Sequence, residues 1–251
     1  MLLDEIVSYW DRRADGYSDS IHEEMDSEVH QEFERHLQAA LPDKGELNCL
    51  DIGCGPGFFS MLLAAQGHHV TAVDYSEEML EFAHRNCAEK GLVIQKVRAD
   101  AQKLPFQDGS ADFICTRNLV WNLEDPERAY KEWLRVLRPG GRLFLYDGNY
   151  YLHYYNPEYQ RARKAIFAVT KTQHHTMKGV DPAPIDEIAR KLPLSRELRP
   201  EWDQRVLKNL GYKIIRTEPY FRTYMDEITR EEKKLIYSFI VVAEKDAESR
   251  R

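Results

Sequence analysis

The stretch Asn48–Leu62, NCLDIGCGPGFFSML, constrains the fold more than any other part of the chain. It places glycine at three alternate positions, Gly53, Gly55 and Gly57, between two apolar runs. Glycine adopts left-handed backbone conformations without steric cost and lets a ligand approach the main chain closely. A glycine-rich turn that leads from a strand into a helix is typical of the ligand-binding edge of an open α/β sheet. The stretch therefore predicts an α/β fold with a binding site at this turn.

Segments with the patterns of strands and helices alternate along most of the chain. Apolar runs bounded by turn residues predict strands, and longer periodic runs with capping residues predict helices. Ser76 is expected to cap one helix and Asp125 another, with Pro126 at the first helical position. This alternation predicts a parallel sheet with helices on both faces. The expected strands are 47–52, 68–74, 92–100, 111–118, 142–147, 212–220 and 235–245, and the expected helices are 30–42, 58–67, 76–91, 125–141 and 201–211.

The spacing of the glycines argues against two common nucleotide-binding loops. A dinucleotide-binding G-x-G-x-x-G that began at Gly53 would need glycine at position 58, where the chain has Phe58. A phosphate-binding loop would need Lys after its last glycine, and none follows here. Asp51 lies just before the turn, where a carboxylate suits an ammonium group and disfavours a pyrophosphate. The pattern therefore predicts a cationic ligand that resembles an amino acid.

Acidic residues also end the next two expected strands. Asp74 lies 17 residues beyond Gly57, at the position from which a carboxylate accepts hydrogen bonds from ribose hydroxyls. Asp100 ends the third strand, and its carboxylate can accept from an exocyclic amine such as adenine N6, with Ala101 leaving room for the ring. The strand tips thus predict a ligand that contains adenosine.

These motifs resemble those of the class I S-adenosylmethionine-dependent methyltransferases. The resemblance implies a Rossmann-like, doubly wound α/β sheet of seven strands whose last strand is antiparallel. It also implies S-adenosylmethionine as cofactor and S-adenosylhomocysteine as product. It is strong over residues 47–147 and weaker over the last 50 residues. The motifs that carry it are LDIGCGPG, VDYSEEML, ADAQKLPF, DFICTRNLVWNLEDPERAYKEWLRVLRPGGRLFLYD and WDQRVLKNLGY.

The resemblance further implies how the chain is divided. An N-terminal helical cap is expected over residues 1–45, and the cofactor-binding Rossmann-like core over residues 46–147. The alternation of strands and helices breaks after the fifth strand, so residues 148–200 are expected to form a lid that contacts the substrate. Residues 201–251 are expected to complete the core with a helix and the last two strands.

Carried over to this chain, the resemblance assigns the glycine turn to the methionine portion of the cofactor and Asp74 to its ribose. Tyr75 and Met79 are expected near the adenine, and Asn118 and Leu119 near the sulfonium. At each position the alternative is an ordinary turn residue or helix cap. The expected cofactor-binding residues are Tyr17, Asp51, Gly53, Cys54, Gly55, Gly57, Asp74, Tyr75, Met79, Asp100, Ala101, Asn118 and Leu119.

Residues for the methyl acceptor are expected at the N-terminus and in the lid. The stretch from Tyr9 to Tyr17 resembles the family's entrance helix, and the segment 146–159 contains six tyrosines, which combine rigid apolar area with a polar tip. Methyl transfer from a sulfonium mainly needs alignment and exclusion of water, and a base only where the acceptor holds its proton tightly. Structural packing is the alternative for these aromatic residues. The expected substrate-binding residues are Tyr9, Trp10, Tyr150, Tyr151 and Tyr154, and the candidate bases are Asp147 and His153.

Composition narrows the class of partner. The net charge is −7, and residues 1–46 hold 13 acidic against four basic side chains, so the basic surface of a nucleic-acid-binding protein is not expected. The four cysteines form no C-x-x-C, and the nine histidines no H-x-x-x-H with a nearby carboxylate, so we expect no metal. No apolar run approaches the ~20 residues that span a bilayer. Early charged residues argue against a signal peptide, so we expect a cytoplasmic protein without a membrane partner.

The sequence thus predicts an enzyme that methylates a small molecule. One alternative is a module that binds S-adenosylmethionine without catalysis. Another is a protein methyltransferase. A peptide acceptor needs an open groove, however, and the expected lid over residues 148–200 suggests closure over a small molecule. The acceptor, the acceptor atom and the choice between monomer and homodimer are left open.

Overall fold

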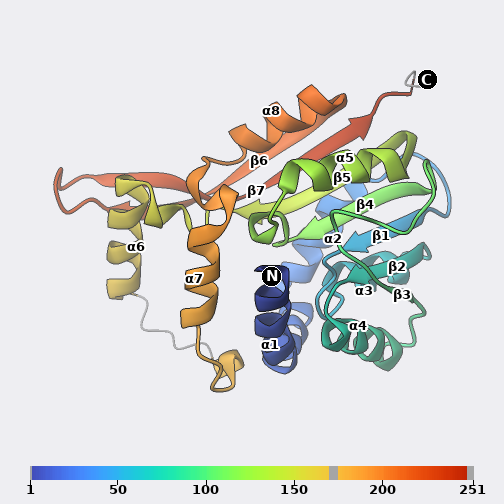
Figure 1. The fold of residues 1–251 in the computed structure, drawn as a ribbon, viewed down its shortest axis with the longest axis horizontal. Coiled ribbons are helices and arrows are strands. Elements are labelled where there is room, and N and C mark those ends of the chain that lie inside the picture. Colours follow the sequence, from blue (N-terminus) through green and yellow to red (C-terminus); the bar gives the residue numbers. More distant parts are fainter. Residues whose placement is uncertain (1, 170–174, 248–251) are drawn as a thin grey trace.

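The computed structural model describes residues 2–169 and 175–247, and within these ranges the chain forms a seven-stranded mixed sheet (Figure 1). The strand order is β3-β2-β1-β4-β5-β7-β6, and β7 runs antiparallel to both of its neighbours. This confirms the predicted doubly wound α/β fold with an antiparallel last strand. The strands are β1 (Asn48–Ile52), β2 (His69–Asp74), β3 (Gln95–Arg98), β4 (Ala111–Arg117), β5 (Leu137–Gly148), β6 (Tyr212–Met225) and β7 (Glu232–Lys245).

Helices cover both faces of the sheet (Figure 1). On one face of the sheet, the helices α1, α2, α3 and α4 pack against the strands in one hydrophobic core. On the opposite face, α5 and α8 pack against the strands in a second core. Successive residues of β1 enter different cores, Cys49 the first and Leu50 the second, because side chains alternate across a strand. The helices are α1 (Leu2–Met25), α2 (Glu28–Ala40), α3 (Phe58–Ala65), α4 (Glu77–Glu89), α5 (Pro126–Val136), α6 (Pro157–Val169), α7 (Ala183–Lys191) and α8 (Glu201–Leu210).

Two helices begin where the sequence predicted. The Ser76 hydroxyl accepts a hydrogen bond from the Met79 amide at 3.1 Å at the start of α4. The Asp125 carboxylate accepts one from the Arg128 amide at 3.0 Å at the start of α5, with Pro126 in the first turn. These side chains satisfy amide groups that have no partner inside a helix.

The end of α5 differs from the prediction. The helix stops at Val136 and β5 starts at once, so the double glycine lies inside the strand instead of closing the helix. The pairing between β4 and β5 is irregular there. Gly140 has a φ of +74°, and a Cβ on Gly141 would lie 2.9 Å from the Arg138 carbonyl oxygen. The glycines therefore serve a bulge at the start of β5.

Strands β6 and β7 form a hairpin that is longer than predicted. β5 ends where Gly148 pairs with Ser238, yet β6 and β7 stay paired as far as Met225 and Glu232. We call this projecting part, residues 219–238, the hairpin arm (Figure 1). The predicted strands stop at residue 220 and begin again at residue 235, but ladder hydrogen bonds and one covered face extend the pairing to Met225 and Glu232.

The segment between β5 and α8 packs against two distant parts of the chain. It comprises η2 (Leu152–Tyr154), α6, η3 (His175–Met177), α7 and η4 (Pro193–Arg196). Helix α7 packs on α1 through Ile185 and Ile188 against Ile6, and α6 packs on the hairpin arm through Tyr159 against Tyr224. The division into cap, core, lid and C-terminal part stays a prediction.

The described ranges hold no helix with both the length and the hydropathy required to cross a bilayer. They also bring no three His, Cys, Asp or Glu side chains together in a way that could hold a metal ion.

Candidate functional site

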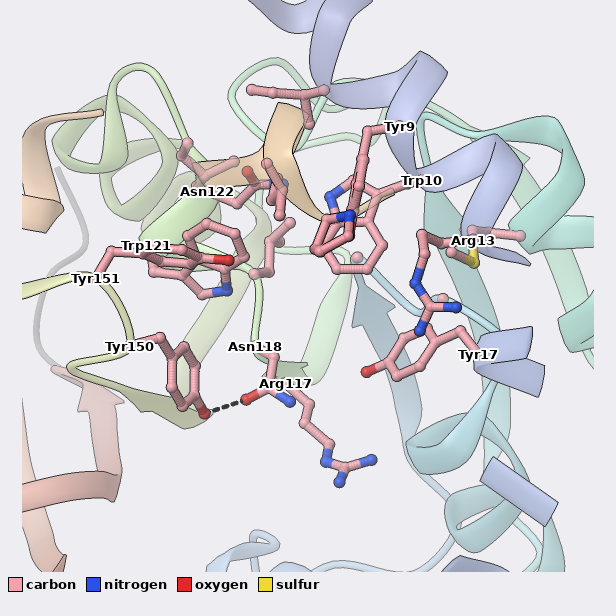
Figure 2. A pocket seen from close by; sticks show the side chains of 18 of the residues that line it. Tyr9, Trp10, Arg13, Tyr17, Arg117, Asn118, Trp121, Asn122, Tyr150 and Tyr151 are labelled. Atoms are coloured by element: carbon pink, nitrogen blue, oxygen red, sulfur yellow. Dashed lines mark hydrogen bonds between the residues drawn. The ribbon is translucent and has the colours of Figure 1, made fainter. Parts of the chain in front are cut away.

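A cavity of about 1720 Å³ lies at the carboxyl ends of β1, β2 and β4 (Figure 2). Its wall combines α1, the strand tips, the segment after β5 and the hairpin arm. Pockets for one drug-sized ligand usually measure roughly 300–1,000 Å³, so this cavity has room for two ligands. We call the part around Gly53 and Gly55 the turn end. We call the part around Trp121, Tyr150 and Tyr151 the aromatic end.

Two of the three predicted glycines face the cavity. Gly53 and Gly55 line it, with φ angles of +66° and +50°. Gly57 does not line it, and a Cβ there would lie 3.1 Å from the Cα of Ala83 in α4. Gly57 therefore allows α3 and α4 to pack closely, which corrects the expectation that it approaches the ligand.

Asp51 lies at the turn end but is largely engaged with α3. Its Oδ2 accepts hydrogen bonds from the Ser60 amide at 2.9 Å and the Ser60 hydroxyl at 2.7 Å. Burial raises the pKa of Asp51 to about 6, and the bonds from Ser60 oppose that rise. Asp51 therefore holds the start of α3 against β1 and contributes to the cavity wall.

Asp74 and Asp100 also line the turn end, as predicted from the strand tips. Asp74 accepts from the Gly55 amide and the Ser76 amide, each at 3.0 Å, which fixes the carboxylate beside the glycine turn. Burial raises the pKa of Asp74 against these two bonds. Asp100 accepts from the Gln102 amide at 2.8 Å.

Asn118 shapes the floor of the cavity, where Figure 2 shows its side chain directed toward Tyr150. It has a φ of +56°, its amide donates to the Tyr146 carbonyl at 2.9 Å, and its Oδ1 accepts from the Tyr150 hydroxyl at 2.5 Å. Leu119 lies against Gly53, and Tyr17 lies against Gly55. The other predicted cofactor residues that line the cavity are Cys54, Tyr75, Met79 and Ala101.

Aromatic side chains from α1, η1 (Val120–Asn122) and the segment after β5 form the aromatic end (Figure 2). Trp10 meets Trp121 with ring centroids 6.5 Å apart, and Trp121 meets Tyr151 at 4.8 Å. Tyr9 and Tyr150 complete this wall, so four predicted substrate residues come together.

Tyr154 does not belong to that wall. Its ring packs on His153 at 4.1 Å and lies under the Arg190 guanidinium at 3.6 Å. It is absent from the cavity lining, so its expected contact with substrate is not supported. The stacking with Arg190 supplies the physical reason for its position.

His153 lines the cavity and is buried. Its Nδ1 lies 3.1 Å from the Tyr150 carbonyl oxygen and 3.3 Å from Arg163 Nη1. Burial, followed by the charge of Arg163, lowers the pKa of His153 to about 4. The imidazole is therefore neutral at pH 7 but only weakly basic.

Asp147 is separated from the cavity. It is 0% exposed, and its Oδ2 lies 3.1 Å from Nη1 of Arg199, which is also fully buried. The same oxygen accepts from the Trp121 amide at 3.1 Å, while Arg199 bonds Asp203 at 2.8 Å. Asp147 therefore fixes the backbone beneath the aromatic end, and this location argues against the expected role as a base.

Several lining residues lay beyond the sequence prediction. Arg117 ends β4 and Trp121 follows it closely, so nearness to the predicted Asn118 and Leu119 was a usable signal for both. Arg163 of α6 and Arg222 of the hairpin arm also line the cavity, with guanidinium groups 4.8 Å and 3.3 Å from the ring centroids of Phe167 and Tyr237. Nothing local marks these two, because folding alone brings them to the cavity.

Comparison with known proteins finds one matching family model and several similar chains. Residues 50–145 match a family model described as a methyltransferase domain. A demethylmenaquinone methyltransferase of Clavibacter sepedonicus is 43% identical over 108 residues, which are 43% of each chain. A ubiquinone biosynthesis O-methyltransferase of Caulobacter vibrioides is 36% identical over 114 residues, or 45% of each chain. The chain thus spans less than half the length of these curated relatives.

Solved structures share the fold over a greater length. A putative methyltransferase from Bacillus halodurans superposes with a TM-score of 0.59 and 18% identity, over 84% of this chain and 96% of that one. A SAM-dependent methyltransferase from Methanosarcina mazei gives a TM-score of 0.57 and 22% identity, over 84% and 97%. At these identities the likeness shows the fold alone.

Proposed function

We propose that this chain transfers a methyl group from S-adenosylmethionine to a small-molecule acceptor, because residues 50–145 match a methyltransferase-domain model and the sheet has the expected strand order. The observation that carries the proposal is one continuous cavity that has a glycine turn and acidic strand tips at one end and an aromatic wall at the other. The first end suits an adenosine-bearing donor, and the second suits a planar acceptor.

The residues at the turn end fit the donor. The half-buried Asp74 is held beside the glycine turn, where its oxygens can accept from ribose hydroxyls. The edge of the adenine would face Asp100 and Ala101. Its ring faces would contact Tyr75 and Met79. Tyr17 and Met79 bound the space at Gly55, since an added Cβ would lie 3.3 Å from the Tyr17 ring and 4.0 Å from Met79 Sδ. Bound there, the donor supplies a methyl group already activated by a positive sulfur.

The residues at the aromatic end support an acceptor with a planar, mainly apolar body. Trp10, Trp121 and Tyr151 offer ring faces to such a body. Toward the hairpin arm the wall becomes basic, because Arg163 and Arg222 stack on rings and form no ion pair with a carboxylate among the described residues. An acidic substituent on the acceptor would face these two arginines.

The chain's own contribution is alignment and exclusion of water. Asn118 is fixed between the two ends by its bond from Tyr150, so it can orient whatever lies between them. His153 can accept a proton at Nε2 in the tautomer whose Nδ1–H donates to the Tyr150 carbonyl. Its lowered pKa favours acceptors that give up their proton readily.

Calorimetry with S-adenosylmethionine and S-adenosylhomocysteine tests donor binding first. Transfer of a labelled methyl group is then measured on a panel arranged in pairs, such as catechol with protocatechuate and 1-naphthol with 1-hydroxy-2-naphthoate. We expect both nucleosides to bind and the acidic member of a pair to be methylated faster. A chain that binds neither nucleoside refutes the proposal.

Two alternatives are outcomes of the same experiment. Donor binding without turnover on any panel member would favour a binding module without catalysis. Transfer to peptides, with none to small molecules, would favour a protein methyltransferase.

A further inference from the structure

The cavity continues beyond the aromatic end to α6 and the hairpin arm. The lining residues of α6 recur at intervals of three or four, so one face of this helix is turned toward the cavity. Those of β7 alternate, so they share one face of the hairpin arm. Figure 1 shows α6 below the hairpin arm, away from β1 to β4. We call this region the outer part and define it by Ala162, Ile166 and Phe167 of α6 and Phe221, Leu235 and Tyr237 of the hairpin arm.

The outer part has an apolar wall that leaves large side chains in contact with water. Ala162 and Leu235 are buried, whereas Phe167 is 60% exposed and Phe221 is 56% exposed. These two aromatic residues belong to different elements, yet both line the same cavity. A single exposed apolar residue is ordinary, but a pair that meets at one cavity indicates a binding surface. An apolar ligand between them would remove both from water, which favours binding in proportion to the area covered.

Two arginines line this region without making its wall polar. The guanidinium groups of Arg163 and Arg222 lie 4.8 Å and 3.3 Å from the ring centroids of Phe167 and Tyr237. Long cationic side chains lay their aliphatic stems along apolar surface and keep the charge at its edge. The region therefore combines apolar surface with positive charge, which suits an amphiphilic molecule and disfavours a cationic one.

The cavity also has more volume than a donor and a one-ring acceptor require. Its volume is about 1720 Å³, and even a donor site at the upper end of ordinary pockets, roughly 1,000 Å³, would leave about 700 Å³. A single ring stacked on Trp121 at the aromatic end would leave the apolar wall of α6 and the hairpin arm uncovered.

We propose that the outer part binds an aliphatic chain carried by the methyl acceptor. The acceptor is then an amphiphile, with a planar head at the aromatic end and a chain that runs along α6 and the hairpin arm. This rests on the proposed function and deepens it, because it defines the acceptor beyond its planar head. The residues that would select the chain are Ala162, Phe167 and Phe221.

The test is a series of acceptor analogues that differ only in chain length. Calorimetry measures the binding of 4-methyl-, 4-butyl- and 4-octylcatechol, below the concentrations at which they form micelles, to the full chain saturated with S-adenosylhomocysteine. Because each buried methylene adds to the apolar contact, affinity should rise about two- to four-fold per methylene from methyl to butyl. It should rise further to octyl, until the chain leaves the outer part.

Two variants should reduce the dependence on chain length. Ala162→Phe places a ring in the outer part, because Ala162 is only 1% exposed and lines the cavity. It should weaken 4-octylcatechol at least about ten-fold and change 4-methylcatechol less than about two-fold. Phe221→Ser alters an exposed side chain, so the variant should fold normally, and it should weaken 4-octylcatechol about three- to ten-fold.

Ile228→Ser is the matched control for Phe221→Ser. Ile228 is also an apolar residue of the hairpin arm and is 70% exposed, but it does not line the cavity. This variant should bind the whole series as the wild type does.

Three results would overturn the proposal. The first is a wild-type series without dependence on chain length, or without binding of any member, which does not depend on any variant folding. The second is an unchanged dependence in Phe221→Ser and in folded Ala162→Phe, which would place the chain elsewhere. The third is an equal loss of all members in Phe221→Ser, which would mean a structural role. Failure of the wild type to bind S-adenosylmethionine or S-adenosylhomocysteine would instead refute the proposed function.

Discussion

Replacing Gly57 with alanine tests whether this glycine serves helix packing or the ligand. Its φ of +89° lies in the left-handed region, where an alanine costs roughly 1–2 kcal/mol. The added Cβ would also lie 3.1 Å from the Cα of Ala83, a backbone atom that cannot turn away, and such overpacking costs typically 1–3 kcal/mol. Gly57→Ala should therefore lower the free energy of unfolding by about 2–5 kcal/mol.

Gly67 at the other end of α3 provides the matched control. It has a φ of +85°, but an added Cβ there meets nothing within 4 Å. Gly67→Ala should therefore cost only the backbone strain, roughly 1–2 kcal/mol. The difference between the two variants isolates the contact with Ala83.

Urea and thermal unfolding measure both effects. For a chain of this size 1 kcal/mol corresponds to about 2–4 °C in Tm, so Gly57→Ala should melt roughly 4–20 °C below the wild type. Because Gly57 is absent from the cavity lining, the folded variant should bind S-adenosylhomocysteine within about two-fold of the wild type. Equal stability of the two alanine variants, or a large loss of binding in a folded Gly57→Ala, would refute this reasoning.

Three further predictions concern acidic and basic side chains. Asp74→Ala should weaken S-adenosylhomocysteine by roughly 1–3 kcal/mol in calorimetry, and unchanged affinity would remove Asp74 from the ribose site. Folding lowers the pKa of His153 from 6.5 to about 4. Between these two pH values the imidazole is protonated in the unfolded chain but not in the folded chain. His153 therefore lowers the free energy of unfolding as the pH falls through this range. His153→Asn should therefore gain up to about 3 kcal/mol relative to the wild type between pH 7 and pH 4 in urea unfolding, and a constant difference would contradict the lowered pKa. Asp147→Asn should cost about 3 kcal/mol of stability by breaking a buried ion pair, yet leave the pH profile of methyl transfer unchanged, and a shifted profile would reinstate Asp147 as a base.

The sequence predicted the elements whose cause is local. A capping hydroxyl at Ser76 and the pair Asp125 and Pro126 act within a few residues, so the starts of α4 and α5 were readable. The turn with Gly53 and Gly55 follows a strand directly, and parallel strands bring their tips to one edge. That geometry placed Asp74 and Asp100 in the same cavity.

Other features depend on contacts that no local pattern records. Asp147 also stands near the tip of a strand, but a buried arginine from the start of α8 holds it away from the cavity. Tyr154 has the same residue type and neighbourhood as Tyr151, but it turns toward Arg190. Buried and exposed residues do not alternate regularly along β6, so the extension of the hairpin arm and the placement of Arg222 were not predictable from periodicity.

The cavity wall is assembled from residues on both sides of the part of the chain that matches the family model. The match to the family model ends at residue 145, whereas Tyr150, Arg163 and Arg222 all come later in the chain. Residues 148–238 therefore supply only part of the proposed acceptor wall, while Trp10 of α1 and Trp121 of η1 supply the rest. Grafting that segment from one such chain onto another should change the charge that an acceptor meets and leave these two ring faces and the turn end in place.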